Sequence, residues 1–252
     1  MIRDWLALSL AVMSASPAYA AEIRVFSGGA PQAALRVMTP EFENSSGHKV
    51  AFTFQIVSQI QQRLAAREQA ELIMLPNQLI SETGKIVPLR TEGRVVLARV
   101  GIGVIVREGT ARPDISSEEG VRKMLLAAKS IALADPRTPS GRHLGEMLSR
   151  LGLADELKRR IIHKGAIHGG GELVATGEAD LGMYLVSEVQ NIKGVAVVGL
   201  LPPALQSHVV YAAAIPASNR EPEPALSFIQ FLTARDKTER WKQAGFELAG
   251  SP

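Results

Sequence analysis

The chain contains no cysteine, and this absence excludes several kinds of site. Without a thiol there is no disulfide, no thiolate metal ligand, no cysteine nucleophile and no cysteine-anchored lipid. A protein of 252 residues can build an adequate core without disulfides, which are mainly a need of much smaller secreted domains. The lack of cysteine is therefore compatible with an exported protein.

Long apolar runs and a strong charge of one sign are also lacking. After the first twenty residues no stretch has the roughly 20 apolar residues that a membrane-spanning helix needs. The net charge is only +3, and Lys and Arg are spread along the chain, whereas nucleic-acid binding usually calls for a clustered basic face. We therefore expect no nucleic-acid partner. The charge supports only a weak attraction for small anions.

The sequence also lacks the common catalytic and metal-binding motifs. There is no HExxH, no GxSxG and no compact set of His, Asp and Glu at metal-ligand spacing. Asp135 follows a strand-like run and could act as a general base, or it could simply cap the turn that Pro136 sets. We therefore assign no catalytic residue, no metal and no cofactor, and we leave open whether the protein is an enzyme.

The first twenty residues have the pattern of a secretory signal peptide. Arg3 is followed by a short apolar run, and the segment ends in Ala-Tyr-Ala at Ala20. The alternative, a buried N-terminal helix, is weaker because the helix would have to stop at Pro17. Cleavage near Ala20 would release a mature chain into the periplasm.

Strand-like and helix-like runs alternate along the rest of the chain, which favours an α/β fold with mainly parallel sheets. Two long apolar runs, Val95 to Val106 and Val209 to Ile215, are separated by about 100 residues. They predict two crossing strands that join two lobes. Residues 21–97 and 209–252 would form lobe one, and residues 98–208 lobe two.

Two capping boxes predict where helices begin. Ser58 with Gln61 marks one start, and Ser116 with Glu119 marks another.

Three turns are candidates for ligand binding, because ligands of such sheets bind at the carboxyl ends of strands. They are "SGGA" at residues 27–30, "TPSGRH" at 138–143 and "IHGGGEL" at 167–173. Glycine turns before helices can offer unpaired amides to an anion, although glycine also serves close packing. Arg142 could clamp a carboxylate, or it could point to solvent from a first helical turn.

Six stretches, two of which include the turns just described, carry a resemblance to a known family. In chain order they are "IRVFSGGAPQAAL", "PEFENSSGHKVAFTF", "AELIML", "KSIALADPRTPSGRHL", "GEADLGMYLVSEV" and "FIQFLTARDKTERWKQAGFEL". Their order and spacing resemble the periplasmic molybdate-binding protein family, the solute receptors of ABC importers. This resemblance implies the two-lobe periplasmic-binding-protein fold of type II, with a ligand cleft between lobes joined by two hinge strands. It also implies a partner, an ABC permease of the inner membrane. We expect a monomer.

Where the family has two serines and a tyrosine for its ligand, this chain has Ala30, Val57 and Leu185, with Ser27, Ser58 and Tyr184 nearby. Losing these donors predicts that molybdate is not a tight ligand. The expected ligand contacts come from Ser27, Gly28, Gly29, Ala30, Val57, Ser58, Ser140, Gly141, Arg142, His168, Gly169 and Tyr184.

Two functions remain open from the sequence. The first is a periplasmic solute-binding protein that closes on a small anion, a molybdate-like oxyanion or, better matched to the site residues, an organic carboxylate. The alternative is an enzyme similar to aconitate isomerase, a relative of the family, that moves a proton on a tricarboxylate. In that case Arg142, with Arg137 nearby, would hold carboxylates, and His168 or Asp135 would carry the proton.

Overall fold

The computed structural model describes residues 20–247, so the predicted signal peptide lies outside the described residues apart from Ala20. Nine strands, ten α-helices and two 3₁₀ helices make up this part of the chain. In chain order they are β1 (Glu22–Ser27), α1 (Gln32–Ser46), β2 (Lys49–Phe54), α2 (Val57–Ala65), β3 (Leu72–Pro76), α3 (Asn77–Thr83), β4 (Val95–Arg107), α4 (Glu118–Ala127), β5 (Ile131–Leu133), α5 (Pro139–Arg150), α6 (Ala154–Leu157), β6 (Ile161–His163), η1 (Ala166–His168), α7 (Glu172–Thr176), β7 (Leu181–Leu185), α8 (Val186–Val189), β8 (Val195–Leu200), β9 (His208–Ala214), α9 (Glu223–Thr233), η2 (Arg235–Lys237) and α10 (Thr238–Gln243).

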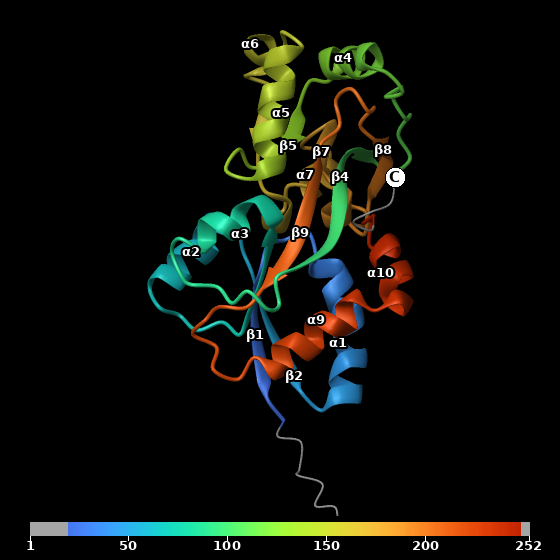
Figure 1. Ribbon diagram of the computed structural model, residues 1–252. Coiled ribbons are helices and arrows are strands. Elements are labelled where there is room, and N and C mark those ends of the chain that lie inside the picture. Colours follow the sequence, from blue (N-terminus) through green and yellow to red (C-terminus); the bar gives the residue numbers. More distant parts are fainter. Residues whose placement is uncertain (1–19, 248–252) are drawn as a thin grey trace, which may run out of the picture.

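The elements form two α/β lobes, stacked along the long axis of the molecule (Figure 1). Lobe one contains β1 to β3 with α1, α2, α3, α9 and α10, and lobe two contains β5 to β8 with α4 to α8. The strands follow the order β2-β1-β3-β9-β4-β7-β5-β6, and β8 pairs with β4 on the side of lobe two. The two-lobe α/β architecture expected from the sequence is confirmed.

The expectation of mainly parallel sheets is only half right. Four of the eight strand pairings are parallel: β1 with β2 and β3, and β5 with β6 and β7. The other four are antiparallel, and each of them involves β4 or β9. The reason is the connectivity, because the strands that carry the chain from one lobe to the other and back must run against their neighbours.

Strand β4 belongs to both lobes. Its first part pairs with β9 as far as Gly101, and from Ile102 onward it pairs with β7 and β8. At Ile102, where β4 changes partners, the Gln206 side chain bonds to the backbone. It accepts a hydrogen bond from the Ile102 amide and donates one to the Ile102 carbonyl, both at 3.0 Å. The lobe limits near residues 98 and 208 stay a prediction, because β4 is continuous through both sheets.

The two helix starts predicted from capping boxes are wrong. Helix α2 begins at Val57 without a side-chain cap, Ser58 is exposed, and Gln61 instead donates to the Thr83 hydroxyl at 3.1 Å. Helix α4 is capped by Ser117, one residue after the predicted cap, and its hydroxyl accepts from the Gly120 amide.

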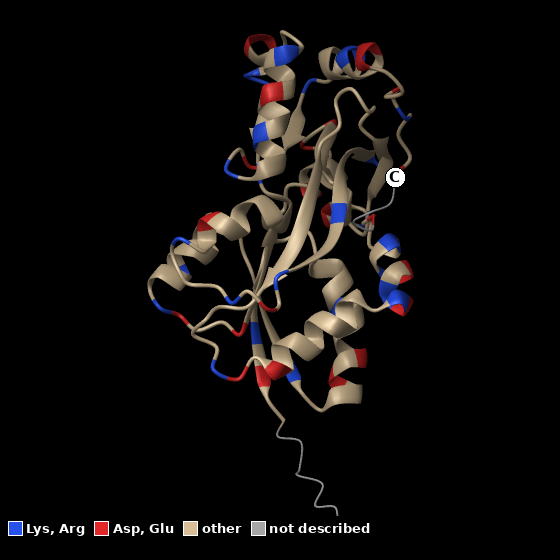
Figure 2. Cartoon of the chain, in the orientation of Figure 1, with Lys and Arg blue, Asp and Glu red and all other residues tan. Residues whose placement is uncertain are grey.

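Acidic and basic residues are interspersed over the helices and loops of both lobes (Figure 2). Within residues 20–247, no helix combines the length and the hydropathy that a bilayer span requires. The same part of the chain holds no cluster of three or more His, Asp or Glu side chains suited to a metal ion.

Candidate functional site

A cavity of about 50 Å³ lies where the two lobes meet. Lobe one contributes the turn after β1, the start of α2 and the β3 and β9 strands, and lobe two contributes the start of α5, the η1 segment and α8. The lining residues are Gly28, Gly29, Gln55, Ile56, Val57, Pro76, Ala134, Asp135, Arg137, Thr138, Pro139, Ser140, Gly165, Ala166, Ile167, Leu185, Glu188, Val209 and Tyr211.

The turn after β1 brings the backbone of lobe one against neighbouring side chains. A Cβ atom on Gly28 would lie 2.8 Å from the Tyr211 hydroxyl, and one on Gly29 would lie 2.3 Å from Cγ2 of Ile167 in lobe two. At both positions a side chain larger than glycine would force its neighbour to move. Ser27 is fully buried, and its hydroxyl donates to the Gly28 carbonyl rather than facing the cavity.

The start of α5 supplies the polar edge of lobe two. The Thr138 hydroxyl accepts a hydrogen bond from the Gly141 amide at 3.1 Å and donates one to the Asp135 carbonyl. A Cβ atom on Gly141 would lie 2.0 Å from that carbonyl oxygen, so glycine is needed for the turn to close. Ser140 is buried and lines the cavity, whereas the Gly141 amide is already used by the cap.

The cation at the cavity is Arg137, and Arg142 lies outside the lining. Arg137 donates to Asp135 from its backbone amide, from Nε and from Nη2, the last at 2.6 Å. This pairing holds the pKa of Asp135 below its usual range. An ionised, paired carboxylate is a weak base, so Asp135 is poorly suited to take up a proton. Arg142 is exposed on the outer face of α5.

Two acidic groups that the sequence reading missed lie on the other side of the cavity: the half-buried carboxyl of Glu188 and the buried phenol of Tyr211. Burial raises the pKa of Glu188, on α8, to about 7. The Tyr211 hydroxyl, on β9, lies beside Gly28, and burial together with the charge of Glu188 raises the pKa of its phenol. In the sequence, Glu188 stands three residues after a fully buried strand, and nothing local separates it from the exposed acids.

Of the remaining predicted site residues, only Val57 lines the cavity. His168 is exposed, and Gly169 lines an outer groove between α1 and α8. Tyr184 is fully buried and donates to the Lys164 carbonyl at 3.1 Å. Ala30 is buried beneath the first turn, whereas Val57 and Leu185 both face the cavity.

Comparison with known proteins places this arrangement in a family. Residues 23–247 match the family model of the bacterial extracellular solute-binding proteins. The chain belongs to this family. Among solved structures, the periplasmic molybdate-binding protein of Azotobacter vinelandii superposes with a TM-score of 0.75 at 20% identity, covering 90% of this chain and 99% of that one.

Two curated relatives of this solute-binding protein carry different names. An aconitate isomerase from a Pseudomonas species is 27% identical over 254 residues, covering 96% of this chain and 95% of the relative. The molybdate-binding protein ModA of Azotobacter vinelandii is 25% identical over 241 residues, covering 93% of each. Binding proteins and an isomerase therefore occur among similar sequences.

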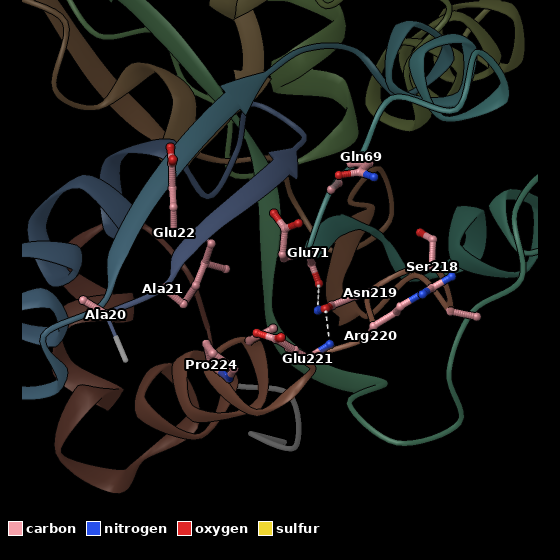
Figure 3. A pocket seen from close by; sticks show the side chains of 14 residues that line it. Ala20, Ala21, Glu22, Gln69, Glu71, Ser218, Asn219, Arg220, Glu221 and Pro224 are labelled. Atoms are coloured by element: carbon pink, nitrogen blue, oxygen red, sulfur yellow. Dashed lines mark hydrogen bonds between the residues drawn. The ribbon is translucent and has the colours of Figure 1, made fainter. Parts of the chain in front are cut away.

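A larger depression, of about 900 Å³, lies elsewhere on lobe one (Figure 3). Its rim carries Glu22, Glu71 and Glu221, and Asn219 donates to the Glu71 carbonyl and accepts from the Glu221 amide. The Glu71 carboxylate is bound by Arg24 at 2.6 Å. This depression is open and acidic, and it contains none of the predicted site residues. The inter-lobe cavity is therefore the candidate site of this solute-binding protein.

Proposed function

We propose that this solute-binding protein is a periplasmic receptor that closes its lobes on a small organic carboxylate and delivers it to an ABC permease. The observation that carries the proposal is the position of Arg137 at an inter-lobe cavity that also contains the Ser140 hydroxyl and the glycine turn after β1. Its Nη1 group has no partner within residues 20–247, so it can donate to a ligand oxygen while Nε and Nη2 hold Asp135.

The apolar side chains in the cavity argue against molybdate. Val57 and Leu185 stand where the molybdate-binding family has a serine and a tyrosine, and both line the cavity. Each lost hydrogen bond to a charged ligand costs about 1.5–3 kcal/mol, so two missing donors weaken molybdate binding by orders of magnitude.

The size of the cavity indicates that binding involves lobe movement. In liquid water one molecule occupies about 30 Å³, so a cavity of about 50 Å³ holds one or two waters. A carboxylate therefore enters only when the lobes separate. Hinge closure of this kind is common among periplasmic binding proteins.

The proposal is tested by calorimetry on the mature protein at pH 6.5. The panel consists of malonate, succinate, malate, citrate, cis-aconitate, trans-aconitate, sulfate and molybdate. We expect at least one carboxylate to bind with a micromolar or lower Kd and molybdate to bind at least a hundredfold more weakly. A sub-micromolar Kd for molybdate, with no carboxylate bound, would contradict the proposal.

A second candidate function, isomerisation of a tricarboxylate, is favoured by Glu188. Shifting a double bond moves a proton between carbon atoms, and the group that carries it works best when its pKa lies near the operating pH. Burial brings the pKa of Glu188 to about 7, whereas Asp135 is held ionised and His168 lies outside the cavity. Glu188 thus replaces both as the proton carrier in this alternative.

Proton NMR of cis- and trans-aconitate incubated with the protein in D₂O distinguishes the two functions. An isomerase interconverts the two acids and incorporates deuterium, and Glu188→Gln abolishes both effects. A receptor binds without converting either isomer.

A further inference from the structure

Glu188 lies at the point where α8 of lobe two meets the first turn of lobe one. Its Oε1 atom is 3.0 Å from the position that a Cβ atom on Gly29 would take. The same side chain lines the inter-lobe cavity and an outer groove of about 330 Å³ between α1 and α8. The carboxyl group therefore forms part of the wall between the cavity and the groove.

Within residues 20–247 no hydrogen bond or ion pair engages this carboxyl group. Arg137, the cation of the cavity, is held by Asp135, and no neighbouring charge contributes to the shift that burial causes in the pKa of Glu188. The charged and titratable groups on the elements packed around it are Arg36 on α1, Arg99 and Arg107 on β4, Asp135 and Arg137 before α5, His168 on η1, Glu172 on α7, Tyr184 on β7 and Tyr211 on β9.

We propose that Glu188 enters the ligand complex as a neutral carboxylic acid and donates a hydrogen bond to a carboxylate oxygen of the ligand. Two carboxylates confined to one closed cavity repel each other strongly, and sharing a proton converts that repulsion into a hydrogen bond. Binding at alkaline pH is then coupled to the uptake of one proton. The inference rests on the proposed carboxylate-binding function.

The outer groove gives that proton a route from solvent. Ser187 precedes Glu188 on α8, and its buried hydroxyl has no hydrogen-bond partner among the described residues. It lines the groove together with Glu188. A water molecule bound there would satisfy the Ser187 hydroxyl and connect Glu188 to bulk solvent while the ligand cavity stays closed.

The direction of the pH dependence follows from the raised pKa. Below a pH of about 7 Glu188 is already protonated, so the Kd for an ionised carboxylate does not change with pH. Above it, a proton must be taken from solvent for each ligand bound, and the Kd rises by up to about tenfold per pH unit. Between pH 6.5 and 8.5 the expected increase is about 25-fold.

The test uses calorimetry at pH 6.5, 7.5 and 8.5 with whichever of the six carboxylates named above has the lowest Kd at pH 6.5. Titration in buffers of different ionisation enthalpy gives the number of protons taken up. Wild-type protein should take up close to one proton at pH 8.5 and about a quarter of a proton at pH 6.5. Glu188→Gln keeps a neutral donor at this position, so it should bind within about threefold of wild type at pH 6.5 and lose the pH dependence.

Glu172→Gln is the matched control, because Glu172 is an exposed carboxylate on the same groove and should leave the wild-type pH profile unchanged. If a carboxylate binds with equal Kd from pH 6.5 to 8.5 and no proton is taken up, the inference about Glu188 is wrong while the receptor proposal stands. If none of the six acids binds at any of these pH values, both fail together.

Discussion

At the scale of single residues, two arginines five positions apart have different surroundings. Both are exposed, but Arg137 lines the cavity and is bound to Asp135, whereas Arg142 does not line it. Arg137→Gln removes the cavity's cation and also leaves Asp135 without its partner, so we expect the Kd for a bound carboxylate to rise roughly ten- to a hundredfold, or about 1.5–3 kcal/mol. Calorimetry with the best acid of the panel measures this change.

Arg142→Gln is the matched comparison, since it makes the same chemical change outside the cavity lining. It should alter the Kd by less than about twofold, as most exposed substitutions have small effects. The opposite pattern, a large loss at Arg142 and none at Arg137, would support the sequence-based assignment of Arg142 and contradict the placement of the site.

At the scale of elements, the start of α5 depends on one hydroxyl group. Thr138 caps the helix by accepting from the Gly141 amide, and the same hydroxyl ties the cap to the Asp135 carbonyl. Thr138→Ala leaves that amide unpaired, and loss of such a cap typically costs about 1 kcal/mol, with a range of about 0.5–2. Urea unfolding at pH 7 should show this decrease in the free energy of unfolding.

Thr138→Ser serves as the control because it keeps the hydroxyl group. Its stability should lie within about 0.5 kcal/mol of wild type, since serine caps helices at least as well as threonine. Equal losses for alanine and serine would mean that the methyl group, rather than the cap, stabilises this turn.

At the scale of the whole molecule, closure depends on close contact between Gly29 of lobe one and Ile167 and Glu188 of lobe two. A methyl group on Gly29 meets Ile167 at 2.3 Å, so Gly29→Ala should hold the lobes apart. Overpacking of this kind costs about 1–3 kcal/mol, which corresponds to a roughly ten- to hundredfold rise in Kd. Small-angle scattering should show that added carboxylate no longer reduces the radius of gyration.

Gly145→Ala is the control for closure, because a Cβ atom on Gly145 meets nothing within 4 Å on the exposed face of α5. It should bind and close like wild type, and replacing a helical glycine should raise stability by about 0.5–1 kcal/mol. Normal closure in Gly29→Ala would show that the lobes do not meet at this turn.

The sequence by itself determined the α/β alternation and the place of the two long strands, β4 and β9. Period-2 and period-3.6 apolar patterns decide these, because they depend only on residues near one another in the chain. The turn after β1 was also predictable from its glycines, and both of them line the cavity. Local pattern was less reliable for helix starts: Gln61 was expected to complete a capping box, yet it bonds Thr83, 22 residues away.

Only the tertiary structure decided which polar groups share the cavity. Arg137, Glu188 and Tyr211 come from three distant segments, and nothing in their local sequence distinguishes Arg137 from Arg142 or Glu188 from the many exposed acids. The pKa of Glu188 is raised because packing of α8 beside Gly29 desolvates its carboxyl group, and such packing is a property of the assembled fold rather than of any segment. The antiparallel pairing of β4 and β9 is also decided by the tertiary structure. The chain passes from lobe one to lobe two in β4 and comes back in β9, so the two strands run in opposite directions.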